Sequence, residues 1–138
     1  MNIDVVKRLR LEYGSRINER RKRNHILHQL FWECTLKCNL KCLHCGSDCK
    51  AIDGKADMPL SDFLHVLDNI CENINPQSVL VITTGGEPLV RPDIIECGKE
   101  ITSRGFIWGM VSNGLLLSEK RLDELISAGL RTISISLD

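Results

Sequence analysis

Three cysteines stand close together near the start of the chain, in the order Cys38-x3-Cys42-x2-Cys45. They follow a short apolar run, Leu30 to Trp32, that has the composition of a strand. Clustered thiols of this kind are typical of a metal site. A closed structural zinc site needs four protein ligands, whereas a cubane iron–sulfur cluster has four irons to ligate. Three cysteines therefore predict a [4Fe–4S] cluster in which one iron is open to a non-protein ligand.

A zinc site is an alternative interpretation of the same segment. Cys34-x3-Cys38 and Cys45-x3-Cys49 extend the cysteine pattern in both directions, and His44 lies within it. Any one of Cys34, Cys49 and His44 would supply the fourth ligand that zinc prefers. If the segment instead binds a cluster, we expect Cys34 to end the first strand and Cys49 to lie in an exposed loop.

Three further polar motifs follow apolar runs that are typical of buried strands. They are Thr84-Gly85-Gly86-Glu87-Pro88, Ser112-Asn113-Gly114 and Ser134-Ile135-Ser136-Leu137-Asp138. Sites in parallel sheets and barrels form at the carboxyl ends of the strands, where these motifs lie. Paired glycines allow a close backbone approach, and a carboxylate accepts hydrogen bonds from an ammonium group. Taken singly, the glycine-rich motifs would be no more than tight turns.

Strands and helices alternate regularly from residue 60 onward. Apolar spacing predicts helices over about 60–74, 92–104 and 118–128, with Ser118 as an N-cap and Gly129 at a C′ position. Strands are predicted near 29–34, 79–83, 106–111 and 132–137. The later strands start about 27 residues apart, which is typical of strand–helix–strand repeats with parallel strands. The fold class is therefore α/β, with about four strands and three helices.

The helical stripes also predict a buried side for each helix. Its residues are Leu60, Leu64, Leu67, Cys71 and Ile74, then Ile94, Gly98 and Ile101, then Leu122, Leu125 and Ile126. A cysteine inside a helix usually packs as a small apolar group, so we interpret Cys71 and Cys97 as core residues. By contrast, the segment from Cys34 to Pro59 has no periodic pattern. A loop of that length in a compact domain is usually functional.

Charge divides the chain into a basic arm over residues 1–28 and a core over residues 29–138. The first 24 residues hold eight Lys and Arg against three Asp and Glu, while the whole chain has no net charge. The cluster Arg20-Arg21-Lys22-Arg23 could contact RNA or an acidic peptide, but we favour a solvated, partly helical arm. Zero net charge argues against a general nucleic-acid or anionic-membrane surface.

The composition also predicts a cellular compartment. No run of 18 apolar residues is present, so no membrane span is expected, and the N-terminus does not have the pattern of a secretory signal. Seven cysteines in 138 residues are then better explained by metal ligation in the reducing cytosol than by disulfides. We therefore expect a cytoplasmic protein.

The four motifs, in this order, resemble those of the radical S-adenosylmethionine (SAM) superfamily. The resemblance covers about Gln29 to Asp138 and implies a partial (β/α) barrel of parallel strands. It implies that Cys38, Cys42 and Cys45 hold a [4Fe–4S] cluster whose open iron is chelated by SAM. Reductive cleavage of SAM would give a 5′-deoxyadenosyl radical. The partners implied are a peptide or small-molecule substrate and an electron donor such as flavodoxin or ferredoxin, with no nucleic acid.

The same resemblance implies which residues contact SAM, and it assigns no catalytic residue. The SAM amino group would lie against Gly85, Gly86, Glu87 and Pro88. Ser112 and Asn113 would help hold the ribose or carboxylate, and Ser136 the ribose. His44 would lie near the adenine, unless it is simply an exposed loop histidine, and Asp138 would contact SAM or substrate. The last motif also resembles the peptide-modifying branch with C-terminal auxiliary clusters.

The sequence departs from the family pattern after its fourth strand. The usual barrel has further strand–helix units, which complete SAM binding and shape the substrate pocket. A strand rich in Ile and Leu is expected to be covered by further structure, because an exposed apolar edge invites aggregation. We therefore expect the front part of a longer protein, or a truncated one. The alternative to an enzyme is a non-catalytic fragment that binds an iron–sulfur cluster or zinc.

Overall fold

The computed structural model describes residues 4–46, 49 and 56–137. The helices are α1 (Val5–Asn24), α2 (Leu60–Cys71), α3 (Ile94–Ser103) and α4 (Glu119–Ser127), and the strands are β1 (Gln29–Thr35), β2 (Leu80–Gly85), β3 (Ile107–Ser112) and β4 (Leu130–Ile135). Two short 3₁₀ turns, η1 (Pro76–Ser78) and η2 (Pro88–Val90), flank β2. The predicted alternation of strands and helices is confirmed, with boundaries shifted by a few residues.

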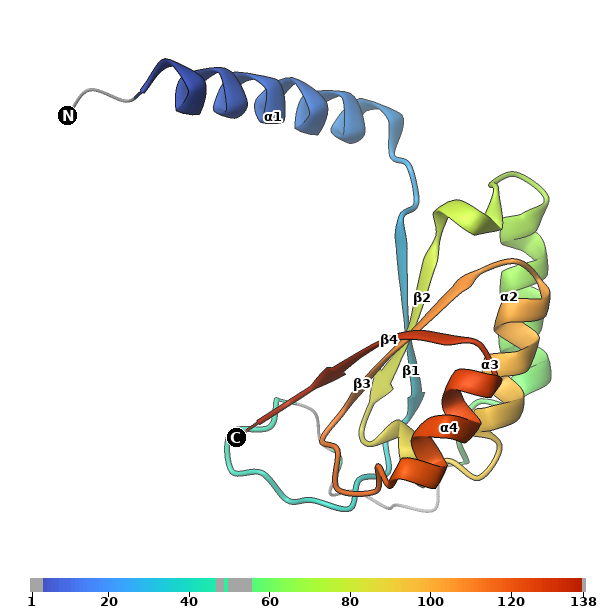
Figure 1. Cartoon of the computed structure of the whole chain (residues 1–138). Helices are drawn as coiled ribbons and strands as arrows, with labels where there is room; N and C mark the ends of the chain where they lie inside the picture. Colours follow the sequence, from blue (N-terminus) through green and yellow to red (C-terminus); the bar gives the residue numbers. More distant parts are fainter. Residues whose placement is uncertain (1–3, 47–48, 50–55, 138) are drawn as a thin grey trace.

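The four strands form one parallel sheet in the order β1-β2-β3-β4. Helices α2, α3 and α4 lie on the same side of this sheet, whereas α1 extends away from it (Figure 1). Within the described residues the sheet does not close into a barrel. The α/β class and the partial barrel are therefore confirmed. The segment from Cys34 to Pro59, which carries the clustered cysteines, is called the cysteine segment. All four strands end on the side where this segment leaves β1 (Figure 1).

The hydrophobic core fills the space between the sheet and the three helices. Its largest fully buried side chain is Trp108 of β3, which packs against Gly98 of α3. A second aromatic contact joins β1 to α2, where Trp32 stacks on Phe63 with ring centroids 3.8 Å apart. Cys97 is buried in this core, as predicted. The helices thus fix the strands from one side and leave the strand ends free to form a site.

Two residues predicted to be buried are exposed. Cys71 is the last residue of α2, and the buried residues of that helix are Phe63 and Leu67. Ile126 of α4 is 56% exposed, although Leu125 of the same predicted stripe is buried. In both helices the contact face is rotated slightly from the predicted stripe, since a periodic pattern fixes the face only to within about one residue.

The helix boundaries follow from capping residues. The hydroxyl of Ser118 accepts a hydrogen bond from the backbone N–H of Arg121 and caps α4, as predicted. Gly129 ends the same helix with a φ of +99°, a conformation that favours glycine. The arm is more helical than predicted, because α1 runs over 20 residues. α1 has the length to span a bilayer but is strongly basic, and none of the described helices is apolar enough to do so.

Gly98 should be the least tolerant glycine of the helices. A methyl group at this position would overlap the buried ring of Trp108. We expect Gly98→Ala to lower the free energy of unfolding by about 1–3 kcal/mol through overpacking. Gly14 of α1 has no atom near the equivalent position, so Gly14→Ala should be neutral or slightly stabilising. Urea unfolding measures both, and equal effects would contradict the packing described.

Candidate functional site

The cysteine segment begins by crossing directly over the glycines at the end of β2. The N–H of Gly86 donates to the carbonyl of Thr35 at 2.7 Å, and the N–H of Glu87 donates to the carbonyl of Lys37 at 2.8 Å. Gly85 has a φ of +111°, and a side chain on either glycine would overlap one of these two carbonyls. The paired glycines are therefore required by the approach of the cysteine segment, whatever else they bind.

Asp57 closes the base of the same segment. Its carboxylate accepts hydrogen bonds from the hydroxyl of Thr35 and the ammonium of Lys37, both at 2.9 Å. Burial alone would raise the pKa of Asp57, but these hydrogen bonds outweigh it and hold that pKa below its usual value. These hydrogen bonds join Asp57, near the end of the cysteine segment, to Thr35 and Lys37 near its beginning. Sequence reasoning missed Asp57, because nothing local marks its partners.

Arg91 also holds the end of β1 in place, through a hydrogen bond to its backbone. Its side chain is 4% exposed and lies over the ring of Trp32, 5.0 Å from the centroid. The guanidinium donates to the carbonyl of Cys34 at 2.5 Å and to the carboxylate of Asp93 at 2.7 Å. A buried charge with an ion-pair partner and a carbonyl acceptor is well satisfied. The arginine therefore holds the strand end from which the cysteine segment departs.

The three predicted cluster cysteines line one small cavity of about 160 Å³. Its lining also includes most of the other predicted site residues, namely Gly85, Gly86, Ser112, Asn113 and Ser136. Among the described residues, no three Cys, His, Asp or Glu side chains are placed to hold a single metal ion. Each thiolate of a cluster ligates its own iron, so three thiols placed around a cavity fit such a group.

The sulfur of Cys38 lies among hydrogen-bond donors. The backbone N–H of Leu40 lies 3.4 Å from it, and the side-chain amide of Asn113 lies 4.0 Å from it. The same amide donates to the side chain of Asn39 at 2.8 Å. Hydrogen bonds to cysteine sulfurs are also among the interactions that tune iron–sulfur clusters. Asn113 thereby joins the end of β3 to the cysteine segment.

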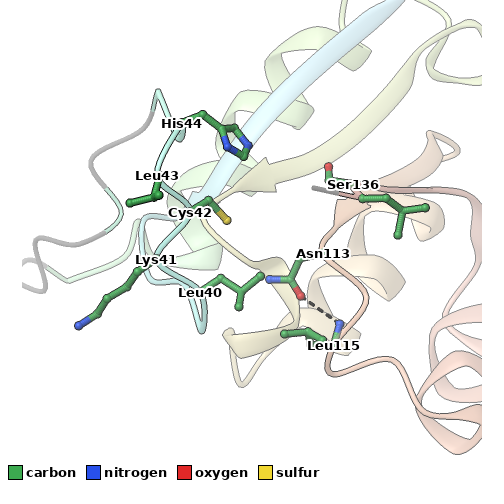
Figure 2. A pocket seen from close by; sticks show the side chains of 9 residues that line it. Leu40, Lys41, Cys42, Leu43, His44, Asn113, Leu115 and Ser136 are labelled. Carbon is green, nitrogen blue, oxygen red and sulfur yellow. Dashed lines mark hydrogen bonds between the residues drawn. The ribbon is translucent and has the colours of Figure 1, made fainter.

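A larger cavity of about 720 Å³ adjoins the first one. In Figure 2, Cys42 and His44 of the cysteine segment lie on one side of it, and Asn113, Leu115 and Ser136 lie on the other. Cys42, Asn113 and Ser136 line both cavities. A hollow of this size is in the usual range for small-molecule sites. The structure thus brings His44, Asn113 and Ser136 around one ligand-sized space beside the thiols.

Glu87 is completely buried, and its carboxylate is satisfied within the protein. It accepts hydrogen bonds from the N–H of Leu89 at 3.0 Å, the hydroxyl of Ser112 at 2.9 Å and the N–H of Asn113 at 2.7 Å. The carboxylate therefore ties the end of β2 to the end of β3. Pro88 is also buried and begins η2. The predicted contacts of Glu87 and Pro88 with SAM stay predictions, and Asp138 lies outside the described residues.

The two flanking cysteines differ from one another. Cys34 is fully buried in the hydrophobic core, and burial raises its pKa to about 12. It lies next to the end of β1, as predicted, and does not line the cavity. Cys49 is 7% exposed, so the prediction that it lies exposed is wrong. Its thiol lines the small cavity, and burial, followed by the nearby Cys45 and Cys38, raises its pKa.

Replacing the Glu87 carboxylate should destabilise the fold without any ligand. In Glu87→Gln, an NH₂ group would face donors that now point at a carboxylate oxygen. We expect the free energy of unfolding to fall by about 1.5–3 kcal/mol, the usual contribution of a hydrogen bond to a charged group. The exposed Glu72 is the matched control, and Glu72→Gln should change it by less than about 0.5 kcal/mol. Equal stability of the two variants in urea unfolding would contradict the buried network.

Comparison with known proteins gives a consistent result. A family profile described as the Radical SAM superfamily matches residues 32–138. An AdoMet-dependent heme synthase of Methanosarcina barkeri is 32% identical over 107 residues, which are 78% of this chain and 30% of that protein. A PqqA peptide cyclase of Rhodopseudomonas palustris is 30% identical over 105 residues, which are 75% of this chain and 27% of that protein. AdoMet is another abbreviation for SAM.

A solved structure has the same fold. The crystal structure of BtrN in complex with AdoMet and 2-DOIA superposes with a TM-score of 0.68 over 80% of this chain and 45% of that chain, at 17% identity. The chain spans about 30% of the length of the heme synthase. The match therefore covers only part of each of those proteins.

Proposed function

The chain belongs to the radical SAM superfamily, and on that premise we propose that it holds a [4Fe–4S] cluster and SAM as the SAM-cleaving part of a radical SAM enzyme. One observation carries this proposal. The three cysteine thiols share a cavity with Gly85, Gly86 and Asn113, and that cavity adjoins a ligand-sized hollow. The two cavities lie at the carboxyl ends of parallel strands, where α/β folds form their sites.

Cys38, Cys42 and Cys45 would each ligate one iron. The N–H of Leu40 and the amide of Asn113 point toward the sulfur of Cys38 and would donate hydrogen bonds to it in the bound cluster. The segment that carries these thiols is held by the hydrogen bond between Thr35 and Asp57 and by the one from Arg91 to the carbonyl of Cys34. The chain would thus present three thiolates and leave one iron of the cluster without a ligand from these three cysteines.

SAM would occupy the larger cavity and reach the open iron through the smaller one. Backbone groups of Gly85 and Gly86 line the small cavity and would contact the amino-acid end of SAM. Asn113 and Ser136 line both cavities, as residues that contact the ribose or carboxylate would need to. His44 lines only the larger cavity, where the adenine would lie. Glu87 would act chiefly through the position of Ser112 and Asn113.

When bound, the reduced cluster would supply the electron that cleaves SAM to a 5′-deoxyadenosyl radical. The residues described here would orient SAM and limit the access of water to it. We propose a peptide or small-molecule substrate and an electron donor such as flavodoxin or ferredoxin. The similarity to a peptide cyclase supports the peptide class. Release of 5′-deoxyadenosine from SAM and dithionite by the reconstituted chain tests this function, and its absence in cluster-loaded protein would indicate a non-catalytic binding fragment.

Loss of any one cluster cysteine should abolish iron binding. After anaerobic reconstitution with iron and sulfide, we expect the wild type to be brown and to hold about four irons per chain. Cys38→Ala, Cys42→Ala and Cys45→Ala should each remain nearly colourless. Cys71→Ala is the matched control, because this thiol is exposed at the end of α2. Iron analysis and visible absorption measure the result. Equal iron loss in the control would contradict the assignment of these three cysteines as cluster ligands.

Ser136 should contribute to SAM affinity and not to stability, because it is exposed at the end of β4. A hydrogen bond of about 0.5–1.5 kcal/mol corresponds to roughly twofold to tenfold weaker binding in Ser136→Ala. Ser127 is a matched control, because it is the last residue of α4 and lies before the start of β4, whereas Ser136 follows the end of β4. Ser127→Ala should bind SAM normally. Titration calorimetry of the reconstituted proteins measures this, and unchanged affinity of Ser136→Ala would remove Ser136 from the site.

A further inference from the structure

The cavity that gathers the three cluster cysteines contains a fourth cysteine, Cys49. Its side chain is 7% exposed, which makes it the most buried thiol of the four. Cys34 and Cys97 are also buried, but they belong to the hydrophobic core, and Cys49 does not. It lines instead the small cavity that Cys38, Cys42 and Cys45 also line. Burial against a thiol-lined cavity is the position of a ligand and not that of a packing residue.

Cys49 also lines the same cavity as residues that are proposed to contact SAM. It shares the small cavity with Gly85, Gly86 and Ser136, which stand on the side proposed for SAM. The other three thiols account for three of the four irons of a cubane. A fourth thiol beside the remaining iron would compete with SAM for it.

We propose that Cys49 is an exchangeable fourth ligand of the cluster. In the absence of SAM its thiolate binds the open iron, and the proton of the thiol passes to solvent. When SAM arrives, its carboxylate and amino groups would displace the Cys49 sulfur from the iron, and the sulfur would take up the proton that the SAM ammonium loses as its nitrogen binds. No electron moves in this exchange. The inference rests on the proposed function, because it requires a cluster held by the other three cysteines.

Such a ligand would keep the reactive iron covered until SAM is present. Exchange also lowers the apparent affinity for SAM by the fraction of time in which the iron is free. If Cys49 occupies the iron for about nine-tenths of the time, its removal should strengthen SAM binding about tenfold. The cost to the chain is weaker SAM binding, and the gain is protection of the cluster from water and oxidants.

The test compares wild type with Cys49→Ala and Cys49→Ser after anaerobic reconstitution. Serine keeps the size of the side chain and guards against a folding defect in the alanine variant. We expect both variants to hold as much iron as the wild type. The electron paramagnetic resonance spectrum of the reduced cluster should differ from wild type without SAM and agree with it when SAM is saturating. Calorimetry should show SAM binding about tenfold more tightly. Cys71→Ala should match the wild type in every measurement.

Three outcomes would overturn the proposal. Identical spectra without SAM and identical SAM affinities would show that Cys49 never binds the iron. Loss of the cluster in both Cys49 variants would make Cys49 a permanent ligand. Spectra that still differ from wild type with saturating SAM would also exclude exchange. Failure of the proposed function gives a different result, because wild type itself would then hold no cluster, or would keep it in Cys38→Ala.

Discussion

The site depends on one backbone contact, the crossing of the cysteine segment over the end of β2. The N–H groups of Gly86 and Glu87 donate hydrogen bonds to the carbonyls of Thr35 and Lys37. These bonds form only because Gly85 and Gly86 carry no side chains, which would overlap the two carbonyls. This contact brings a loop from β1 against the end of its neighbouring strand. It therefore sets the position of Cys38, which follows Lys37 directly, relative to the glycine-rich turn.

Two buried polar groups and the partly exposed Asp57 extend this contact across the sheet. Arg91 holds the end of β1, Asp57 closes the base of the cysteine segment, and Glu87 joins the end of β2 to the end of β3. Each one is satisfied by specific partners, so that each favours one arrangement of the strand ends. A site of this kind is positioned before any ligand binds. Such preorganisation reduces the free energy that a ligand must supply to order the loop.

Local pattern was enough to predict the strands, the helices and several of the residues that line the two cavities. The cysteine spacing, the glycine pair and Asn113 are all recognisable because each belongs to a short motif of neighbouring residues. Asp57 was not predictable, because its partners lie some 20 residues earlier. Cys49 was predicted to be exposed for a related reason, since no periodic pattern marks its burial beside the cavity that it shares with Cys45 and Cys38. Contacts between segments decide these positions, and a single sequence does not display them.

The central claim is that the thiols of this loop hold a cluster whose open iron faces SAM. Electron–nuclear double resonance on the reduced, reconstituted chain tests it most directly, with SAM carrying ¹⁵N at its amino group. The account predicts a ¹⁵N coupling large enough to require a bond between that nitrogen and iron, and it predicts that the coupling disappears when unlabelled SAM is supplied. A cluster signal with no ¹⁵N coupling at saturating SAM would contradict the account.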